Sequence, residues 1–144
     1  MMAQNPISSI LKSLDKDSPK FEYVLDKLIK AVVKIINNTE ELKEELIGFD
    51  DIYQTYVIDA DFNYWLEVSD GKVFYQKGVN QKALFTMNLK KDIIIQILKN
   101  EVSGTDAFMK GKIKVSGSLS QGLRYIKLFR LFVTYLMKKN GIKY

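Results

Sequence analysis

The apolar residues of the chain recur at two different periods, and the first region has the period of a helix. From Phe21, apolar residues follow at i, i+3, i+4 and i+7 as far as Ile36, which predicts an amphipathic helix. A short second helix is expected to end at Gly48. Residues 1–17 are mostly polar, with one expected helical turn, and we interpret them as a flexible N-terminal extension.

The middle region changes to the period of a strand. Residues 52–60, 62–69 and 72–77 are rich in β-branched and aromatic side chains, which is typical of strands. Asp70-Gly71 lies between the last two segments and predicts a tight hairpin turn. Residues 83–87 predict a fourth strand.

The last region returns to helices with one more strand between them. A helix is expected from Asn88 to about Leu98, a fifth strand over residues 112–116, and a long helix from Ser118 to about Lys139. The resulting order is ααββββαβα. A run of strands flanked by helices predicts an α+β fold, with a five-stranded, mostly antiparallel sheet and helices packed on one face.

Composition narrows the chemistry that such a fold could perform. A chain of 144 residues is expected to form one domain, which we place at residues 18–144. It contains no Cys and no His, so the commonest general base and the usual metal ligands are missing. We therefore expect a protein that is not an enzyme and needs no metal or cofactor. The first residues resemble no signal peptide, and the longest apolar tract is far shorter than the ~20 residues of a membrane span, which favours a cytoplasmic protein.

Charge is distributed unevenly along the chain. From Ala107 onward there are nine Lys or Arg and no Asp or Glu, whereas the preceding residues carry 13 basic against 17 acidic side chains. A basic C-terminal third could face an anionic membrane or the phosphates of a ligand such as coenzyme A. An ordinary lysine-rich surface is the alternative. No nucleic-acid partner is expected, because the basic residues alternate with Leu and Phe and no recognition motif accompanies them.

One group of carboxylates could be interpreted as a cation site. Asp50, Asp51, Asp59 and Asp61 lie close together in sequence, and oxygen ligands suit a divalent cation. Their spacing matches no loop motif, and Asp is common at exposed turns. A solvated strand end is therefore the favoured interpretation.

Two apolar groups exceed what one core requires. They are Trp65, Phe74 and Leu84 on the predicted outer face of the sheet, and Leu128, Leu131 and Tyr135 beside the basic stripe of the last helix. Apolar surface beyond one face indicates a further contact. A dimeric interaction or scaffolding domain is therefore the alternative function, and a homodimer is the alternative partner.

Residues 107–117 are the most informative motif in the chain. The segment Ala107-Phe108-Met109-x-Gly111-Lys112-Ile113-Lys114-Val115-x-Gly117 resembles the motif A-F-x-x-G-K-[LI]-K-[VI]-x-G of the sterol carrier protein 2 family. The hairpin Leu66-x-Val68-x-x-Gly71-Lys72-Val73 and the order of elements from about Lys20 to Lys139 are also similar.

The resemblance implies a single α+β domain with an apolar tunnel between sheet and helices. Members of the family bind sterols, fatty acids, fatty acyl-CoA or other lipids, and transfer them or present them to enzymes. This chain differs from the better-studied animal members by its N-terminal extension and its longer, more basic last helix. It also lacks a peroxisomal Ser-Lys-Leu ending.

A tunnel wall needs large and adaptable apolar side chains, which several predicted core positions supply. Ordinary core packing would use the same residues, so their role in ligand binding is a hypothesis. The candidate ligand-binding residues are Phe85, Met87, Ile94, Leu98, Phe108, Met109, Ile126 and Phe129.

Overall fold

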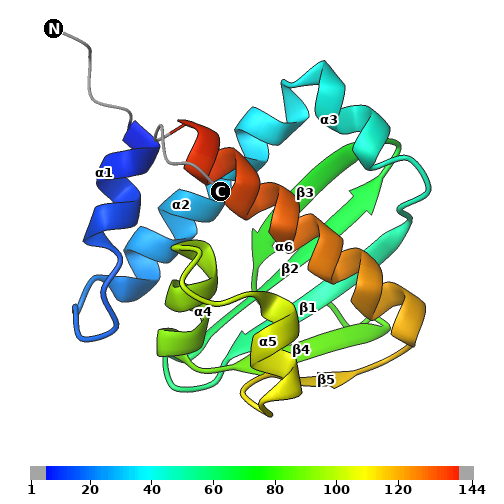
Figure 1. Cartoon of the computed structure of the whole chain (residues 1–144). Coiled ribbons are helices and arrows are strands. Elements are labelled where there is room, and N and C mark those ends of the chain that lie inside the picture. The colour runs from blue at the N-terminus through cyan, green and yellow to red at the C-terminus, as the bar shows by residue number, and fades with distance from the viewer. Residues whose placement is uncertain (1–5, 140–144) are drawn as a thin grey trace, which may run out of the picture.

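The computed structural model describes the backbone of residues 6–139 and the side chains of residues 7–135. It contains a sheet of five strands with helices packed on one face (Figure 1). The elements are α1 (Pro6–Ser13), α2 (Phe21–Asn37), α3 (Glu40–Glu45), β1 (Asp51–Val57), β2 (Phe62–Ser69), β3 (Lys72–Lys77), β4 (Phe85–Leu89), α4 (Lys91–Leu98), α5 (Gly104–Met109), β5 (Lys114–Ser116) and α6 (Leu119–Lys139).

The strands lie in the order β3-β2-β1-β4-β5. β1 and β4 are parallel, and the other three pairs are antiparallel. The predicted α+β fold with a mostly antiparallel five-stranded sheet is therefore confirmed. Asp70 and Gly71 have φ values of 52° and 74°. Positive φ at both central residues is typical of a two-residue hairpin turn, because this turn matches the right-handed twist of the two strands.

Because β4 pairs with β1 and not with β3, the β3–β4 connection must pass both β2 and β1. The side chain of Gln54 holds this connection and is almost fully buried. Its Nε2 donates to the carbonyls of Tyr64 (3.0 Å) and Gly78 (3.1 Å), and its Oε1 accepts from the backbone N–H of Asn80 (2.8 Å). Both polar atoms of this buried amide are therefore hydrogen-bonded, and the bonds fix the connecting loop on the outer face of the sheet.

The inner face of the sheet carries the core. Its alternate residues Tyr64, Leu66 and Val68 are buried, and the buried residues of β4 on the same face are Phe85, Met87 and Leu89. α6 crosses in front of this face in Figure 1, and α2 and α4 cover the rest of it. Alternation along the strands predicted these faces correctly.

The outer face retains exposed apolar side chains. The rings of Trp65 and Phe74 lie 5.5 Å apart, and Phe74 is 55% exposed. Leu84 is 75% exposed just before β4.

The N-terminal segment differs from the flexible extension that we expected over residues 1–17. α1 lies against α2 and the far end of α6 (Figure 1), and its Ile7 and Leu11 are buried in the main core together with Leu14. Four apolar residues, Ile7, Ile10, Leu11 and Leu14, do recur at the spacing of a helix, but the pattern spans only two turns and was too short to predict this packing. Residues 1–5 lie outside the described part of the chain, and the domain boundary at residue 18 stays a prediction.

The link from β5 to α6 depends on a close approach of two backbone segments. Gly117 has φ +126°, and a Cβ built there would lie 2.5 Å from the Leu84 carbonyl oxygen and 2.9 Å from the Phe85 Cα. Ser118 then caps α6, since its Oγ accepts from the N–H of Gln121 at 3.1 Å. The glycine that ends the sequence motif is therefore required by the packing of β4 against the start of α6.

Gly117→Ala is expected to lower the free energy of unfolding by about 2–4 kcal/mol, because the new Cβ meets backbone atoms and the φ is strained. Gly104→Ala is the matched control: Gly104 has open space around its Cα and lies in a helix, so the change should be neutral or slightly stabilising. Urea unfolding of both variants measures the difference. Equal midpoints would show that the close approach does not exist.

Candidate functional site

A small apolar cavity lies between the inner face of the sheet and three helices. Its lining comes from α2, β2, α4 and α6, and consists of Ile29, Tyr64, Leu66, Ile94, Leu98, Tyr125, Leu128, Phe129 and Phe132. The volume of the cavity is about 10 Å³, which is close to the minimum for one water.

This volume is much smaller than a lipid chain needs. Pockets for small-molecule ligands commonly enclose about 300–1,000 Å³. The structure therefore has a closed apolar seam where the resemblance implied a tunnel. A lipid chain would fit only after α4 or α6 had moved away from the sheet.

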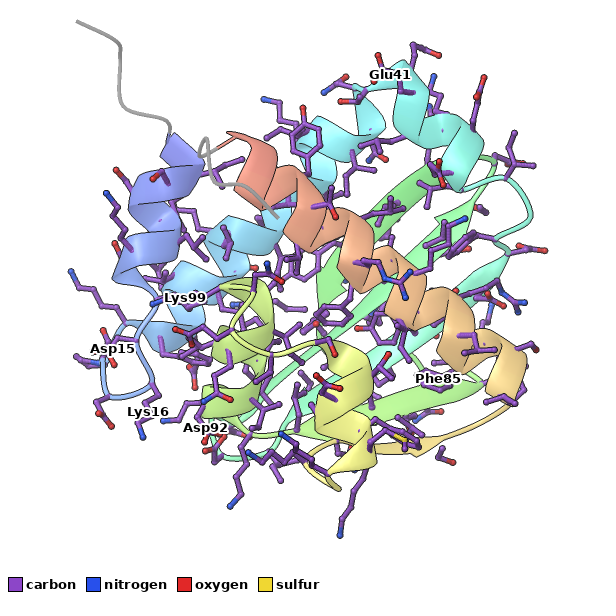
Figure 2. All side chains as sticks on the ribbon, in the orientation of Figure 1. Asp15, Lys16, Glu41, Phe85, Asp92 and Lys99 are labelled. Carbon is purple, nitrogen blue, oxygen red and sulfur yellow. The ribbon has the colours of Figure 1, made fainter. Side chains whose placement is uncertain are left out.

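Tyr125 of α6 is the centre of the contact between that helix and the sheet. Its ring stacks on Tyr53 of β1, with centroids 4.5 Å apart and planes at 3°. It also meets Phe85 edge-on at 5.8 Å and Phe129 at 5.1 Å. Figure 2 shows Phe85 beside the first half of α6, where its ring would touch a Cβ added at Gly122. Aromatic packing of this kind fixes the depth at which α6 sits on the sheet.

Three hydroxyl groups meet in this otherwise apolar region. The Tyr125 hydroxyl lies 2.5 Å from Thr55 Oγ1 and 3.4 Å from the Tyr64 hydroxyl. All three side chains are buried. Burial raises the pKa of the Tyr64 hydroxyl and raises that of Tyr125 well above its usual value. Both tyrosines are therefore neutral at physiological pH.

A charged network holds the first half of α6 to the start of β1. Arg124 donates from Nε to Asp51 Oδ2 at 2.5 Å and from Nη2 to Oδ1 at 3.1 Å. Tyr53 Oη (2.7 Å) and Gln121 Nε2 (3.3 Å) also donate to this carboxylate. Burial alone would raise the pKa of Asp51, but the hydrogen bonds from Arg124, Tyr53 and Gln121 outweigh it, so the pKa is lowered. The hydrogen bonds that Arg124 donates to Asp51 raise the pKa of Arg124.

The cavity contains some of the eight candidate ligand-binding residues. Ile94, Leu98 and Phe129 line it. Phe85 and Met87 are buried on β4 beside it, and Ile126 is half-buried on the neighbouring face of α6.

The remaining two candidates, Phe108 and Met109, lie at the surface. They are 45% and 77% exposed, so the structure does not place them at the cavity wall as we expected. The reason is that the short helix α5 turns Ala107 into the core.

The buried face of α6 includes Leu128, which we predicted to lie beside the basic stripe. Tyr125, Leu128 and Phe132 point inward, and Leu128 is 1% exposed. Leu128 therefore cannot belong to an exposed dimer edge with Leu131 and Tyr135, which are only half-buried. The spacing of residues 125, 128, 129 and 132 is i, i+3, i+4 and i+7, so the sequence did contain the correct signal. The lining residues from α2 and β2 were missed because they follow from tertiary packing alone.

Two of the four carboxylates considered as a cation site are engaged elsewhere. Asp51 is paired with Arg124, and Asp59 Oδ1 accepts from the backbone N–H of Lys91 at 2.8 Å. Among the residues that the structure describes, no three Asp or Glu side chains gather closely enough to hold a metal ion. Within the same part of the chain, no helix has the length and apolar character to cross a membrane.

Several solved structures share this fold. Sterol Carrier Protein 2 from Yarrowia lipolytica, in its apo form, is 16% identical with a TM-score of 0.59, over 82% of this chain and 95% of that one. The sterol carrier protein domain 2 of Helicoverpa armigera is 19% identical with a TM-score of 0.58, over 83% and 95%. The chain thus has the fold of a compact sterol-carrier domain.

A similar domain also occurs inside a larger protein. The sec-alkylsulfatase Pisa1 from Pseudomonas sp. is 22% identical with a TM-score of 0.53, over 60% of this chain, which spans only 14% of that protein. No curated protein sequence matches the chain.

The sequence itself identifies the family. The model of the SCP-2 sterol transfer family matches residues 29–130, which is more than half of the chain. The chain therefore belongs to the SCP-2 sterol transfer family, as its motif indicated. Membership supports binding or transfer of a lipid or sterol as the general function.

Arg124→Met is expected to lower the free energy of unfolding by about 2–4 kcal/mol at pH 7, because it leaves the buried Asp51 carboxylate without its main partner. Lys127→Met is the matched control. Lys127 lies one turn along α6, and its 3.4 Å ion pair with Glu45 is exposed on both sides, so its loss should cost no more than about 1 kcal/mol. Urea unfolding at neutral pH compares the two.

The effect of Arg124→Met should depend on pH. Since its pKa is lowered by folding, ionised Asp51 contributes stability above its unfolded-state pKa of about 3.9, and this contribution is lost as the pH falls through the lower folded-state value. The destabilisation should therefore shrink when unfolding is repeated at about pH 3. A loss that stays constant from pH 7 to pH 3 would contradict this assignment.

Proposed function

We propose that this protein is a non-enzymatic carrier that binds the apolar chain of a lipid between the inner face of the sheet and helices α4 and α6. The observation that carries the proposal is the closed seam itself: its lining comes from four elements and is apolar except for two tyrosine hydroxyls. Membership of a sterol transfer family and the fold shared with sterol carrier proteins support the same function.

The energetics allow the seam to open for a ligand. Burying a lipid chain contributes roughly 0.8 kcal/mol per methylene. A dozen methylenes would offset the cost of moving a helix and of ordering the ligand. α4 packs through apolar side chains alone in its buried part, which consists of Ile93, Ile94, Ile95, Ile97 and Leu98.

We infer further that the surface around α5 faces a membrane when lipid is exchanged. α5 packs against α6 (Figure 1). They expose large apolar side chains, and Met109 and Leu119 are 77% and 78% exposed. Lys110, Lys112 and Lys114 are exposed next to them. Apolar residues beside lysines suit an interface with anionic lipids.

The same lysines could bind the phosphates of an acyl-CoA. A cytoplasmic location and a homodimer also remain predictions from the sequence. For the dimer, the exposed Phe74 and Leu84 on the outer face of the sheet are the apolar positions still available.

Phe129→Asn should weaken binding of a fluorescent fatty acid about tenfold, because it sets an unpaired amide against the bound chain. Phe74→Asn is the matched control on the exposed outer face, and it should change the dissociation constant less than twofold. Fluorescence titration, with thermal melting to verify folding, measures both. If the wild-type protein shows no saturable binding, or both variants bind equally well, the seam is not the lipid site.

Met109→Asp should reduce binding to vesicles of phosphatidylcholine and phosphatidylserine by fivefold or more, because it adds a negative charge to the proposed membrane-facing surface. Val79→Asp makes the same change at another exposed apolar position, 52% exposed in the β3–β4 connection, and should have little effect. Vesicle co-sedimentation measures both. Equal effects of the two variants would contradict a specific surface around α5.

A further inference from the structure

The two edges of the sheet differ in length. β5 forms one edge with three residues, Lys114–Ser116, and β3 forms the other edge with six, Lys72–Lys77. Backbone N–H and C=O groups along a free edge can pair with a strand of another molecule, and a very short edge strand limits such pairing. The β3 edge is therefore the one at which the sheet could be extended.

A side chain of α2 occupies one residue of the β3 edge. The Asn37 amide donates from Nδ2 to the Val73 carbonyl at 2.7 Å, and its Oδ1 accepts from the Val73 N–H at 2.8 Å. Asn37 is the last residue of α2 and is half-buried. One amide thus makes both hydrogen bonds that a neighbouring strand would make at Val73.

The next backbone groups along this edge are open. Backbone groups alternate in direction along an antiparallel strand, so Tyr75 and Lys77 present theirs on the same side as Val73. In agreement, the Gly78 N–H points the other way and donates to the Asn63 carbonyl at 2.8 Å. No strand lies beyond β3, and within the described residues no hydrogen bond from outside the sheet reaches the backbone of Tyr75 or Lys77.

The β3 strand of a second copy of this chain fits this edge as an antiparallel partner. Pairing centred on Tyr75 sets Val73 of each copy opposite Lys77 of the other. It also sets Phe74 opposite Gln76, so no two lysines face each other. Two of the three outward-facing pairs in this register need the backbone of Val73, which Asn37 occupies.

We propose that the side chain of Asn37 blocks the β3 edge and so prevents antiparallel pairing of β3 with the same strand of a second copy. Without this amide, the sheets of two copies can join at their edges into one continuous sheet. With it, only the Tyr75 pair can form. The proposal concerns the edge of the sheet and not the cavity, so it is independent of lipid binding and of a dimer through the outer face.

Sedimentation velocity of the wild-type protein and two asparagine variants tests the proposal. Asn37→Ala should self-associate at least about tenfold more tightly than the wild-type protein, because two more residue pairs can form hydrogen bonds. Asn38→Ala is the matched control, since Asn38 is exposed and its Nδ2 donates within α2 to the Lys34 carbonyl at 2.8 Å. Its self-association should equal that of the wild-type protein.

A second substitution locates the contact. Lys77→Pro, added to Asn37→Ala, removes the N–H that Lys77 would donate to Val73 of the other copy, and an edge strand tolerates proline where its N–H faces outward. The double variant should associate no more than the wild-type protein. Association that persists in the double variant would overturn the proposal. So would an Asn37→Ala protein that is folded, as thermal melting shows, and associates no more than Asn38→Ala.

Amide hydrogen exchange of the wild-type protein decides the matter if Asn37→Ala does not fold. The Val73 N–H is bonded to Asn37, whereas the Tyr75 N–H faces an open edge. Val73 should therefore exchange at least about tenfold more slowly than Tyr75. Equal protection of the two amides would show that the edge is closed along its whole length and would overturn the proposal.

Discussion

The packing of Tyr125 on the inner face of the sheet is the interaction on which the rest of the structure depends. Its ring stacks on Tyr53 and meets Phe85 edge-on, and its hydroxyl bonds to Thr55. One residue earlier, Arg124 binds the buried carboxylate of Asp51. Together these contacts set the position of α6 over β1 and β4. The close approach at Gly117 brings the chain into that position directly from β5.

The same arrangement divides α6 into two parts with different roles. The first part carries Gln121 and Arg124, which hydrogen-bond to Asp51. The second part lines the cavity with Leu128, Phe129 and Phe132 and makes only apolar contacts there. Apolar contacts are non-directional and can reform around a ligand. Separating Arg124 from Asp51 would instead leave a buried carboxylate without its partner, which lowers the stability of the protein. Under the proposed function, the seam therefore opens between α4 and the second part of α6, while the first part stays attached.

Much of the fold followed from the sequence, but the cavity did not. Alternation in residues 62–69 and the Asp70-Gly71 turn predicted the hairpin, because both signals are local. The motif at residues 107–117 identified the family. The burial of Leu128 was mispredicted although its spacing fits a helical stripe, because the last helix is apolar beyond one face and only packing on the sheet selects the stripe that is buried. The cluster of three buried hydroxyls could not be predicted, because it joins Thr55, Tyr64 and Tyr125 from β1, β2 and α6 through the strand register and helix position.

Amide hydrogen exchange of the wild-type protein, with and without saturating 1-decanol, tests lipid binding in the seam most directly. The proposed function predicts that decanol changes the exchange of α4 and of the second part of α6. The amides of β3 and α3, which contribute no residue to the cavity lining, should be unaffected. No change in α4 or α6, or a change confined to the exposed surface around α5, would contradict binding between the sheet and these helices.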